Sequence, residues 1–161
     1  MKKLYALSRL RKIIGGHKKQ GKRIVLANGC FDLIHVGHIR YLKEAKEKGD
    51  VLVVALNSDP SVRKLKGKGR PVLNQKERAE IISSFYFVDY VTFFDELNVS
   101  PVLLFLKPDV HAKGSDYTVD TVPERETVKK YGGKIAITGG TKVKFTSQVI
   151  EDIVSRIRDR E

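Results

Sequence analysis

The sequence is poor in the residues that would tie it to an oxidising compartment or to a membrane. Cys30 is the only cysteine in 161 residues, so no intrachain disulfide can form. No apolar run approaches the roughly 20 residues that cross a bilayer. Arg9, Arg11 and Lys12 interrupt the N-terminus before the apolar core of a signal peptide can form. We therefore expect a cytoplasmic protein without a transmembrane helix.

Acidic residues are missing from two segments, although the chain has 19 of them. Residues 1–25 carry nine Lys or Arg, and residues 63–70 carry five more, with no Asp or Glu in either segment. The first segment favours a solvated helix face, and its alternative is an anion site for nucleic acid or a phosphorylated small molecule. For residues 63–70, which follow a predicted strand, the anion site is the favoured interpretation.

Apolar runs alternate with helical patterns from residue 23 onward. The predicted strands are 23–27, 51–56, 88–93, 110–112 and 134–138. The predicted helices are 38–48, 75–85, 102–106, 123–131 and 147–158. This alternation predicts right-handed βαβ crossovers, and hence a Rossmann-like α/β fold: an open parallel sheet of about five strands with helices on both faces. Residues 1–161 are predicted to form a single domain, with residues 1–22 as a basic helical extension.

Glycine and histidine are concentrated in residues 28–38, directly after the first predicted strand. Parallel sheets bind ligands beyond the carboxyl ends of their strands. Gly29 and Gly37 let the backbone approach a ligand closely, and free N–H groups at a helix start attract phosphate. His35 and His38 are three residues apart, so both rings lie on one helix face. There they can donate hydrogen bonds to phosphoryl oxygens and carry charge near neutral pH.

Other interpretations of this segment remain open. A histidine at a helix start can serve as a polar cap, and a pair spaced by three can bind zinc, although no second cysteine or third ligand accompanies it. No metal site is therefore predicted.

Two further residues of this segment have expected structural roles. Phe31 is expected to anchor the loop in the core. Asp32 is expected to accept hydrogen bonds from backbone N–H groups while orienting a histidine.

Two pieces of this segment resemble a known signature. Asn-Gly-Cys-Phe-Asp at 28–32, followed by His-Val-Gly-His at 35–38, resembles the motif of the cytidylyltransferase-like superfamily of nucleotidyltransferases. Further segments resemble the ADP-heptose synthase adenylyltransferases, which act on D-glycero-β-D-manno-heptose 1-phosphate. They are 57–59, 63–67, 70–72, 77–79, 113–117 and 131–133. The similarity extends from about residue 22 to residue 155.

The resemblance implies a role for each matching residue. The implied catalytic residues are His35, His38 and Lys66. The implied nucleotide-binding residues are Asn28, Gly29, Phe31, Asp32, Gly37, Lys113, Gly114, Asp116, Thr146 and Ser147. The implied substrate-binding residues are Asn57, Asp59, Arg70 and Arg78.

Physical alternatives exist for several of these residues. Arg78 could form a surface salt bridge with Glu77 or Glu80 instead of binding a phosphate. The hydroxyls of Thr146 and Ser147 could simply cap the last helix.

The sequence departs from the usual pattern of the heptose family at four places. Ala27 replaces a threonine, Ser115 a glycine and Phe145 a serine, and residues 95–101 replace a shorter segment. None of these departures touches the histidine pair. They bear on the choice of nucleotide and sugar, and they leave the predicted reaction class unchanged.

The implied reaction transfers AMP from ATP to a sugar 1-phosphate, giving ADP-heptose and pyrophosphate. The phosphate nucleophile is already anionic at pH 7, so no general base is required. Mg²⁺ is expected to arrive with ATP, because no carboxylate cage is evident. Superfamily members often pair near their active sites, so the resemblance admits a homodimer.

Other functions stay open at this point. Within the enzyme class they are a glycerol-3-phosphate or phosphoethanolamine cytidylyltransferase and an FMN adenylyltransferase. A function that is not enzymatic is also open: the basic N-terminus suggests a nucleic-acid-binding module. The sequence, however, shows no recognisable RNA- or DNA-reading element.

Overall fold

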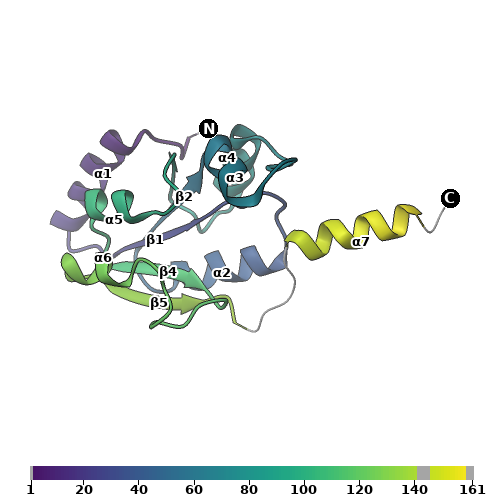
Figure 1. Ribbon diagram of the computed structural model, residues 1–161. Helices are drawn as coiled ribbons and strands as arrows, with labels where there is room; N and C mark the ends of the chain where they lie inside the picture. Colours follow the sequence, from purple (N-terminus) through teal and green to yellow (C-terminus); the bar gives the residue numbers. More distant parts are fainter. Residues whose placement is uncertain (1, 141–145, 159–161) are drawn as a thin grey trace.

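A five-stranded parallel sheet organises the chain in the computed structural model, which describes residues 2–140 and 146–158 (Figure 1). The strands are β1 Ile24–Gly29, β2 Val51–Asn57, β3 Tyr90–Phe94, β4 Val110–Gly114 and β5 Lys134–Thr138. The helices are α1 Leu7–Lys19, α2 Val36–Lys46, α3 Asp59–Lys66, α4 Gln75–Ser84, α5 Ser100–Leu106, α6 Arg125–Lys130 and α7 Thr146–Arg158. The predicted Rossmann-like α/β fold is confirmed.

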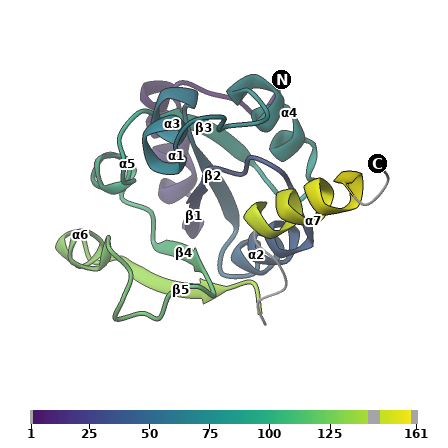
Figure 2. The same cartoon turned by 45° about the vertical axis from the view of Figure 1, so that its right-hand side comes forward.

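Helices cover both faces of the sheet because the central strands are apolar on both sides (Figure 2). In β1, Val25 and Ala27 pack toward α2 and α4. Ile24 and Leu26, which alternate with them, pack toward α1, α5 and α6. A strand that is buried on both faces reads as a continuous hydrophobic run, as β1 and β2 do.

The strand order β3-β2-β1-β4-β5 reverses direction between β1 and β4. Their pairing ends where Ala27 lies opposite Ala112. On the outer sides, β1 stays paired with β2 up to Gly29, and β4 stays paired with β5 up to Gly114. The last residues of β1 and β4 therefore face each other across a crevice, which is the position where open α/β sheets bind ligands.

The first half of the basic segment 63–70 is helical. Residues Asp59–Lys66 form α3, whose N-cap Ser58 accepts a hydrogen bond from the Ser61 N–H. Pro60 fits the first helical turn, where no N–H is needed. The helix ends at Gly67, whose φ of 89° is readily adopted only by glycine. Lys66 is thus the last residue of a helix.

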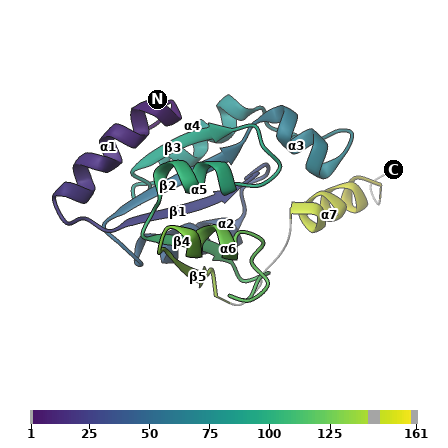
Figure 3. The ribbon, with the colours of Figure 1, turned by 60° about the vertical axis from the view of Figure 1, so that its left-hand side comes forward.

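The N-terminal segment, predicted to be a helical extension, packs against the sheet and contributes to the core. Leu10 and Ile14 of α1 are buried against the sheet. Backbone hydrogen bonds join Tyr5 N–H to the Val91 carbonyl and Val91 N–H to the Lys3 carbonyl. Residues 2–22 are therefore part of the packed domain, and α1 lies along the sheet (Figure 3).

The C-terminal helix α7 projects away from the rest of the fold (Figures 1 and 3). None of its described side chains is buried. Phe145, one of the family departures, lies outside the described residues. Over 2–140 and 146–158, no helix combines the length and the apolar character that a membrane span requires.

Candidate active site

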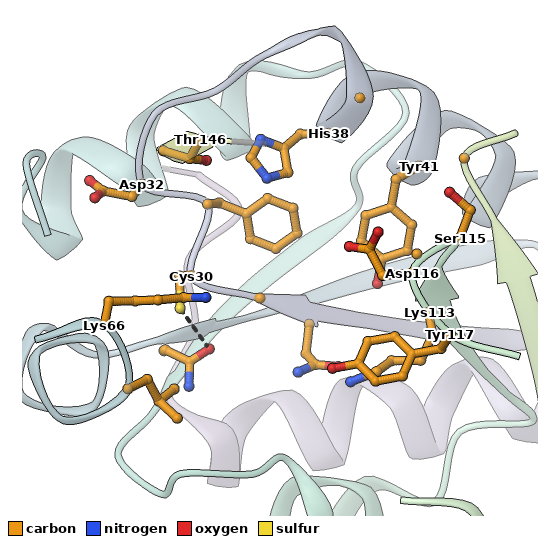
Figure 4. Close-up of a pocket in the computed structure, with 18 of the residues that line it drawn as sticks. Cys30, Asp32, His38, Tyr41, Lys66, Lys113, Ser115, Asp116, Tyr117 and Thr146 are labelled. Carbon is orange, nitrogen blue, oxygen red and sulfur yellow. Dashed lines mark hydrogen bonds between the residues drawn. The ribbon is translucent and has the colours of Figure 1, made fainter. Parts of the chain in front are cut away.

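A cavity of about 510 Å³ opens where β1 and β4 part (Figure 4). Two of the predicted site residues, Asp59 and Arg78, do not line it. The predicted residues that do are Asn28, Gly29, Phe31, Asp32, His35, Gly37, His38, Asn57, Lys66, Arg70, Lys113, Gly114, Asp116, Thr146 and Ser147. The structure therefore brings residues from five separate segments to one crevice.

The start of α2 holds both histidine rings through its own backbone. His35 is the N-cap, and its Nδ1 accepts a hydrogen bond from the Gly37 N–H at 3.2 Å. The backbone N–H of His35 in turn donates to Nδ1 of His38 at 3.4 Å. A neutral imidazole carries a single proton, so an accepting Nδ1 leaves that proton on Nε2. Both rings therefore hold an N–H donor on Nε2, and both line the cavity.

The two rings stack with their centroids 3.8 Å apart. Burial lowers the pKa of His35 below its ordinary value. Burial, and next the neighbouring His35, lower the pKa of His38 to about 4. Both rings are consequently neutral at pH 7. The expectation that the two histidines carry charge near neutral pH is therefore wrong. Each neutral ring can still donate a hydrogen bond through Nε2.

Asp32 connects the loop between β1 and α2 to the loop that precedes α4. Its carboxylate accepts hydrogen bonds from the backbone N–H groups of Val72 (2.8 Å) and Leu73 (3.0 Å) and from Arg70 Nε. Burial alone would raise the pKa of Asp32, but these hydrogen bonds outweigh it and hold the pKa below the ordinary value. The predicted backbone contacts are present, although to another loop. Across the described parts of the chain, no hydrogen bond links Asp32 to a histidine.

Phe31 supports the histidines from the core side, as its predicted anchoring role requires. Its side chain is buried, its ring centroid lies 5.2 Å from that of His38, and it stacks on Tyr41. A Cβ at position 29 would lie 2.9 Å from this ring, so Gly29 leaves room for Phe31. The Tyr41 hydroxyl donates to the Ala112 carbonyl, which connects α2 to β4.

Arg78 is a structural residue, and its expected contact with a phosphate is corrected. Its side chain is fully buried in α4. It donates to the carbonyls of Cys30 (2.5 Å), Asn57 (2.8 Å) and Leu73 (3.1 Å). It also donates to the carboxylate of Asp59 at 2.8 Å, which likewise removes Asp59 from the expected substrate contacts. One guanidinium thereby joins the loop after β1, strand β2, helix α3 and the 70–74 loop.

The β4 side of the cavity carries a buried cation. Lys113 Nζ lies 3.2 Å from a carboxylate oxygen of Glu124 and 4.9 Å from the ring centroid of Tyr117. Figure 4 shows Lys113 and Tyr117 side by side, with Ser115 and Asp116 from the same loop above them. This side combines an aromatic face, an ammonium group and backbone groups beyond the last β1–β4 pair, a set suited to a nucleobase.

The β2 side of the cavity carries cationic and amide groups. Lys66, at the end of α3, lies near Cys30 in Figure 4. The Cys30 thiol donates to Oδ1 of Asn57 at 3.8 Å, and Nδ2 of Asn57 donates to Ser61. Burial raises the pKa of Cys30, so this group is a thiol and not a thiolate at neutral pH. Leu65, Leu97 and Asn98 complete this side.

Several residues of the cavity were missed by the sequence interpretation. Tyr41 follows His38 by three positions, so the helical spacing that paired the histidines could have found it. Leu97 and Asn98 belong to the segment 95–101, which departs from the family pattern. Glu124 gave no signal, because only the fold brings it to Lys113.

The cavity suits phosphate better than a protein-held metal ion. Its nitrogen donors come from histidine, lysine, arginine and amide side chains. Within the described ranges, no group of three or more His, Cys, Asp or Glu is arranged to hold a metal. A divalent ion bound between the phosphates of a nucleotide would need few protein ligands.

The parallel sheet carries a stacked histidine pair at its switch point, where open α/β sheets bind ligands, as expected for a nucleotidyltransferase. The family model described as cytidylyltransferase-like matches residues 26–158, and the chain belongs to that family. The chain is 47% identical over 142 residues to the bifunctional protein HldE of Geobacter sulfurreducens, covering 88% of this chain and 29% of that protein. It is 45% identical over 144 residues to the bifunctional protein HldE of Pelobacter propionicus, covering 89% and 30%. The chain thus spans about three tenths of the length of these relatives.

Two solved structures share the fold. The lipopolysaccharide core biosynthesis protein of Thermoplasma volcanium is 32% identical, with a TM-score of 0.66 over 77% of this chain and all of that one. The pantoate-beta-alanine ligase of Francisella tularensis is 17% identical, with a TM-score of 0.63 over 87% of this chain and 67% of that one. The second likeness is one of fold alone.

Proposed function

We propose that the protein transfers AMP from ATP to a sugar 1-phosphate, with heptose 1-phosphate as the acceptor, and releases pyrophosphate. The observation that carries this proposal is the pair of Nε2–H donors on His35 and His38, held in a cavity that Lys66 and Lys113 also line. The heptose is supported by the resemblance of residues 57–72 and 113–117 to the ADP-heptose family. It is also supported by the similarity to a lipopolysaccharide core biosynthesis protein.

The tautomer of the histidines decides what they can do in this reaction. Because each Nδ1 accepts a backbone N–H and each Nε2 already holds a proton, neither neutral ring can take up a proton as a base. The proposed nucleophile needs none, since a sugar 1-phosphate is anionic at pH 7. Its oxygen forms a bond to the α-phosphorus of ATP, and the bond to the bridging oxygen breaks. Pyrophosphate leaves with that electron pair.

The protein then contributes position and charge. His35 and His38 donate to triphosphate oxygens, and Lys66 neutralises the leaving pyrophosphate. Donors that are fixed before the substrate arrives need no reorganisation during the reaction. Mg²⁺, brought by ATP, would screen the phosphate charges. The β4 side with Lys113 and Tyr117 is proposed to hold the base, and the β2 side with Asn57 and Arg70 the acceptor.

Pyrophosphate release with a matrix of substrates tests the proposal. ATP and CTP are each combined with heptose 1-phosphate, glycerol 3-phosphate and FMN. Fastest release with ATP and heptose 1-phosphate is expected. Faster release with CTP and glycerol 3-phosphate would instead identify a glycerol-3-phosphate cytidylyltransferase. Faster release with ATP and FMN would identify an FMN adenylyltransferase. No release with any pair, together with salt-dependent binding of generic RNA, would favour the nucleic-acid-binding module.

Replacement of one histidine tests the catalytic role. His38→Ala should lower kcat on the order of 10²–10³-fold, because it removes a preorganised donor. Circular dichroism and the melting temperature show whether the fold is kept. His17→Ala is the matched control, because His17 lies on α1 outside the cavity and hydrogen-bonds Tyr90 of β3. Near-normal turnover of His38→Ala would contradict the proposal.

A further inference from the structure

A fully buried histidine lies beneath the cavity without lining it. His111 is the second residue of β4, has 0% of its surface exposed and pairs in register with Leu26 of β1. Side chains alternate along a strand, so Asn28 emerges on the same face of β1 as Leu26. This places Asn28 diagonally across from His111, within reach of a hydrogen bond.

The contact between the two side chains couples the tautomer of His111 to the orientation of the Asn28 amide. Its Nε2 lies 3.1 Å from Oδ1 of Asn28. A carbonyl oxygen only accepts, so Nε2 carries the proton and donates it. The other ring nitrogen, Nδ1, is buried without a hydrogen-bond partner in the described part of the chain. Burial, and next the charge of Lys113, lower the pKa of His111 to about 3, so the ring stays neutral.

In the same hydrogen bond the Asn28 amide has its oxygen toward His111. With Oδ1 turned to β4, the planar amide turns its Nδ2 group to the opposite side, and Asn28 lines the cavity. No hydrogen bond between described residues engages this Nδ2. The flipped amide would instead present a carbonyl oxygen, which repels the oxygens of a phosphate.

We propose that His111 is a positioning residue that makes Asn28 a hydrogen-bond donor toward an acceptor oxygen of the bound nucleoside triphosphate. The inference rests on the proposed function for its ligand. The part of the proposal that concerns structure, namely the hydrogen bond that orients the Asn28 amide, does not depend on the identity of the ligand. His111 touches no substrate and acts only through Asn28.

A double-mutant cycle with Asn28 tests the proposal. His111→Phe keeps a ring but loses the donor, and it should raise the KM for ATP roughly three- to ten-fold, the range of one lost hydrogen bond, with a smaller effect on kcat. His111→Gln, whose amide can still donate, should recover part of that loss. In an Asn28→Ala background, His111→Phe should raise the KM no further.

The control separates positioning from folding. Thr92→Val also alters a buried polar side chain, and its hydroxyl has no partner among the described residues and does not line the cavity. It should change the melting temperature but not the KM. An unchanged KM in folded His111→Phe, or an increase that persists with Asn28→Ala, would overturn the proposal.

A second measurement holds even if the protein releases no pyrophosphate. Long-range ¹⁵N correlation spectra of the ligand-free wild type report which ring nitrogen of His111 is protonated. A proton on Nε2 is expected, and a proton on Nδ1 would overturn the proposal. Absent turnover alongside an Nε2 proton would reject the proposed function and retain the part of the proposal that concerns structure. This measurement also decides where a His111 variant fails to fold.

Discussion

At the scale of single residues, the site depends on polar side chains whose partners are backbone groups. The Nδ1 atoms of His35 and His38 accept from N–H groups of their own helix start. Asp32 accepts from two N–H groups of a neighbouring loop. Contacts of this kind orient a ring or a carboxylate without a second side chain, so each orientation follows from the path of the chain.

The lowered pKa values of the histidines predict how stability changes with pH. Between pH 6.5 and about 4, the unfolded chain binds a proton at position 38 that the native chain does not bind. His111 adds to this effect down to about pH 3. The free energy of unfolding should therefore decrease as the pH falls through this window. Urea titrations at a series of pH values measure it, and His38→Gln should give a shallower decrease than the wild type. Equal slopes would contradict the lowered pKa of His38.

Asp32 is predicted to be a stability residue. Asp32→Asn keeps the volume but removes the charge that holds Arg70 and two backbone N–H groups. The free energy of unfolding should fall by roughly 3 kcal/mol, as for other broken buried pairs. Asp120→Asn, which breaks the exposed pair of Asp120 with Arg125, should cost under about 1 kcal/mol. Equal effects of the two substitutions on the urea midpoint would contradict this role.

At the scale of elements, the helices α3 and α4 are joined to the sheet through one buried cation. Arg78 reaches carbonyls or carboxylates on β2, α3 and two loops, and so holds Asp59, the first residue of α3, in place. Lys66 lies at the other end of the same helix. The position of the proposed catalytic lysine therefore depends on a residue that does not line the cavity.

Arg78→Lys tests this structural role. A single ammonium cannot reproduce the planar fork of the guanidinium, so the buried acceptors lose partners. The free energy of unfolding should fall by about 3 kcal/mol or more. Arg156→Lys is the matched control, because Arg156 lies on the exposed helix α7. A stable Arg78→Lys protein with a raised KM for the acceptor would instead restore the phosphate contact that the sequence suggested.

The order of the elements could be predicted from the sequence, whereas their lateral contacts could not. Apolar runs such as 51–56 identify buried strands, and the spacing of His35 and His38 identifies a shared helix face. Strand neighbours and buried pairs depend on the crossover geometry. Nothing near position 78 in the sequence shows that an arginine there will be fully buried. Likewise, Asn28 and His111 are 83 positions apart, so the sequence does not show that they are in contact.

At the scale of the whole molecule, the two terminal helices differ in what they bury. Leu10 and Ile14 of α1 belong to the core, whereas no described side chain of α7 is buried. The exposed apolar residues of α7 include Ile153, Val154 and Ile157. The cooperative body of the protein therefore includes α1 and excludes most of α7.

Truncations at the two ends should consequently have opposite results. Removal of residues 148–161 should leave the thermal unfolding transition of the body nearly unchanged, because none of the described side chains of α7 is buried. Removal of residues 1–19 should lower the stability by several kcal/mol, since each buried leucine or isoleucine contributes about 1.5–3 kcal/mol. Differential scanning calorimetry of both variants measures this. A large loss from the C-terminal truncation would show that α7 is held by contacts that the described structure does not contain.

The parting of β1 and β4 has a consequence for how this enzyme can change. The groups proposed for the base come from the β4 side, and those proposed for the acceptor come from the β2 side. The histidine pair stands between them at the start of α2. A substitution at Ser115 would thus alter the β4 side, proposed to hold the base, without touching Lys66. A substitution at Leu97 would alter the β2 side, proposed to hold the acceptor, without touching Lys113. If the proposed function holds, nucleotide and acceptor preferences should change independently by mutation, with the histidine pair between them unaltered.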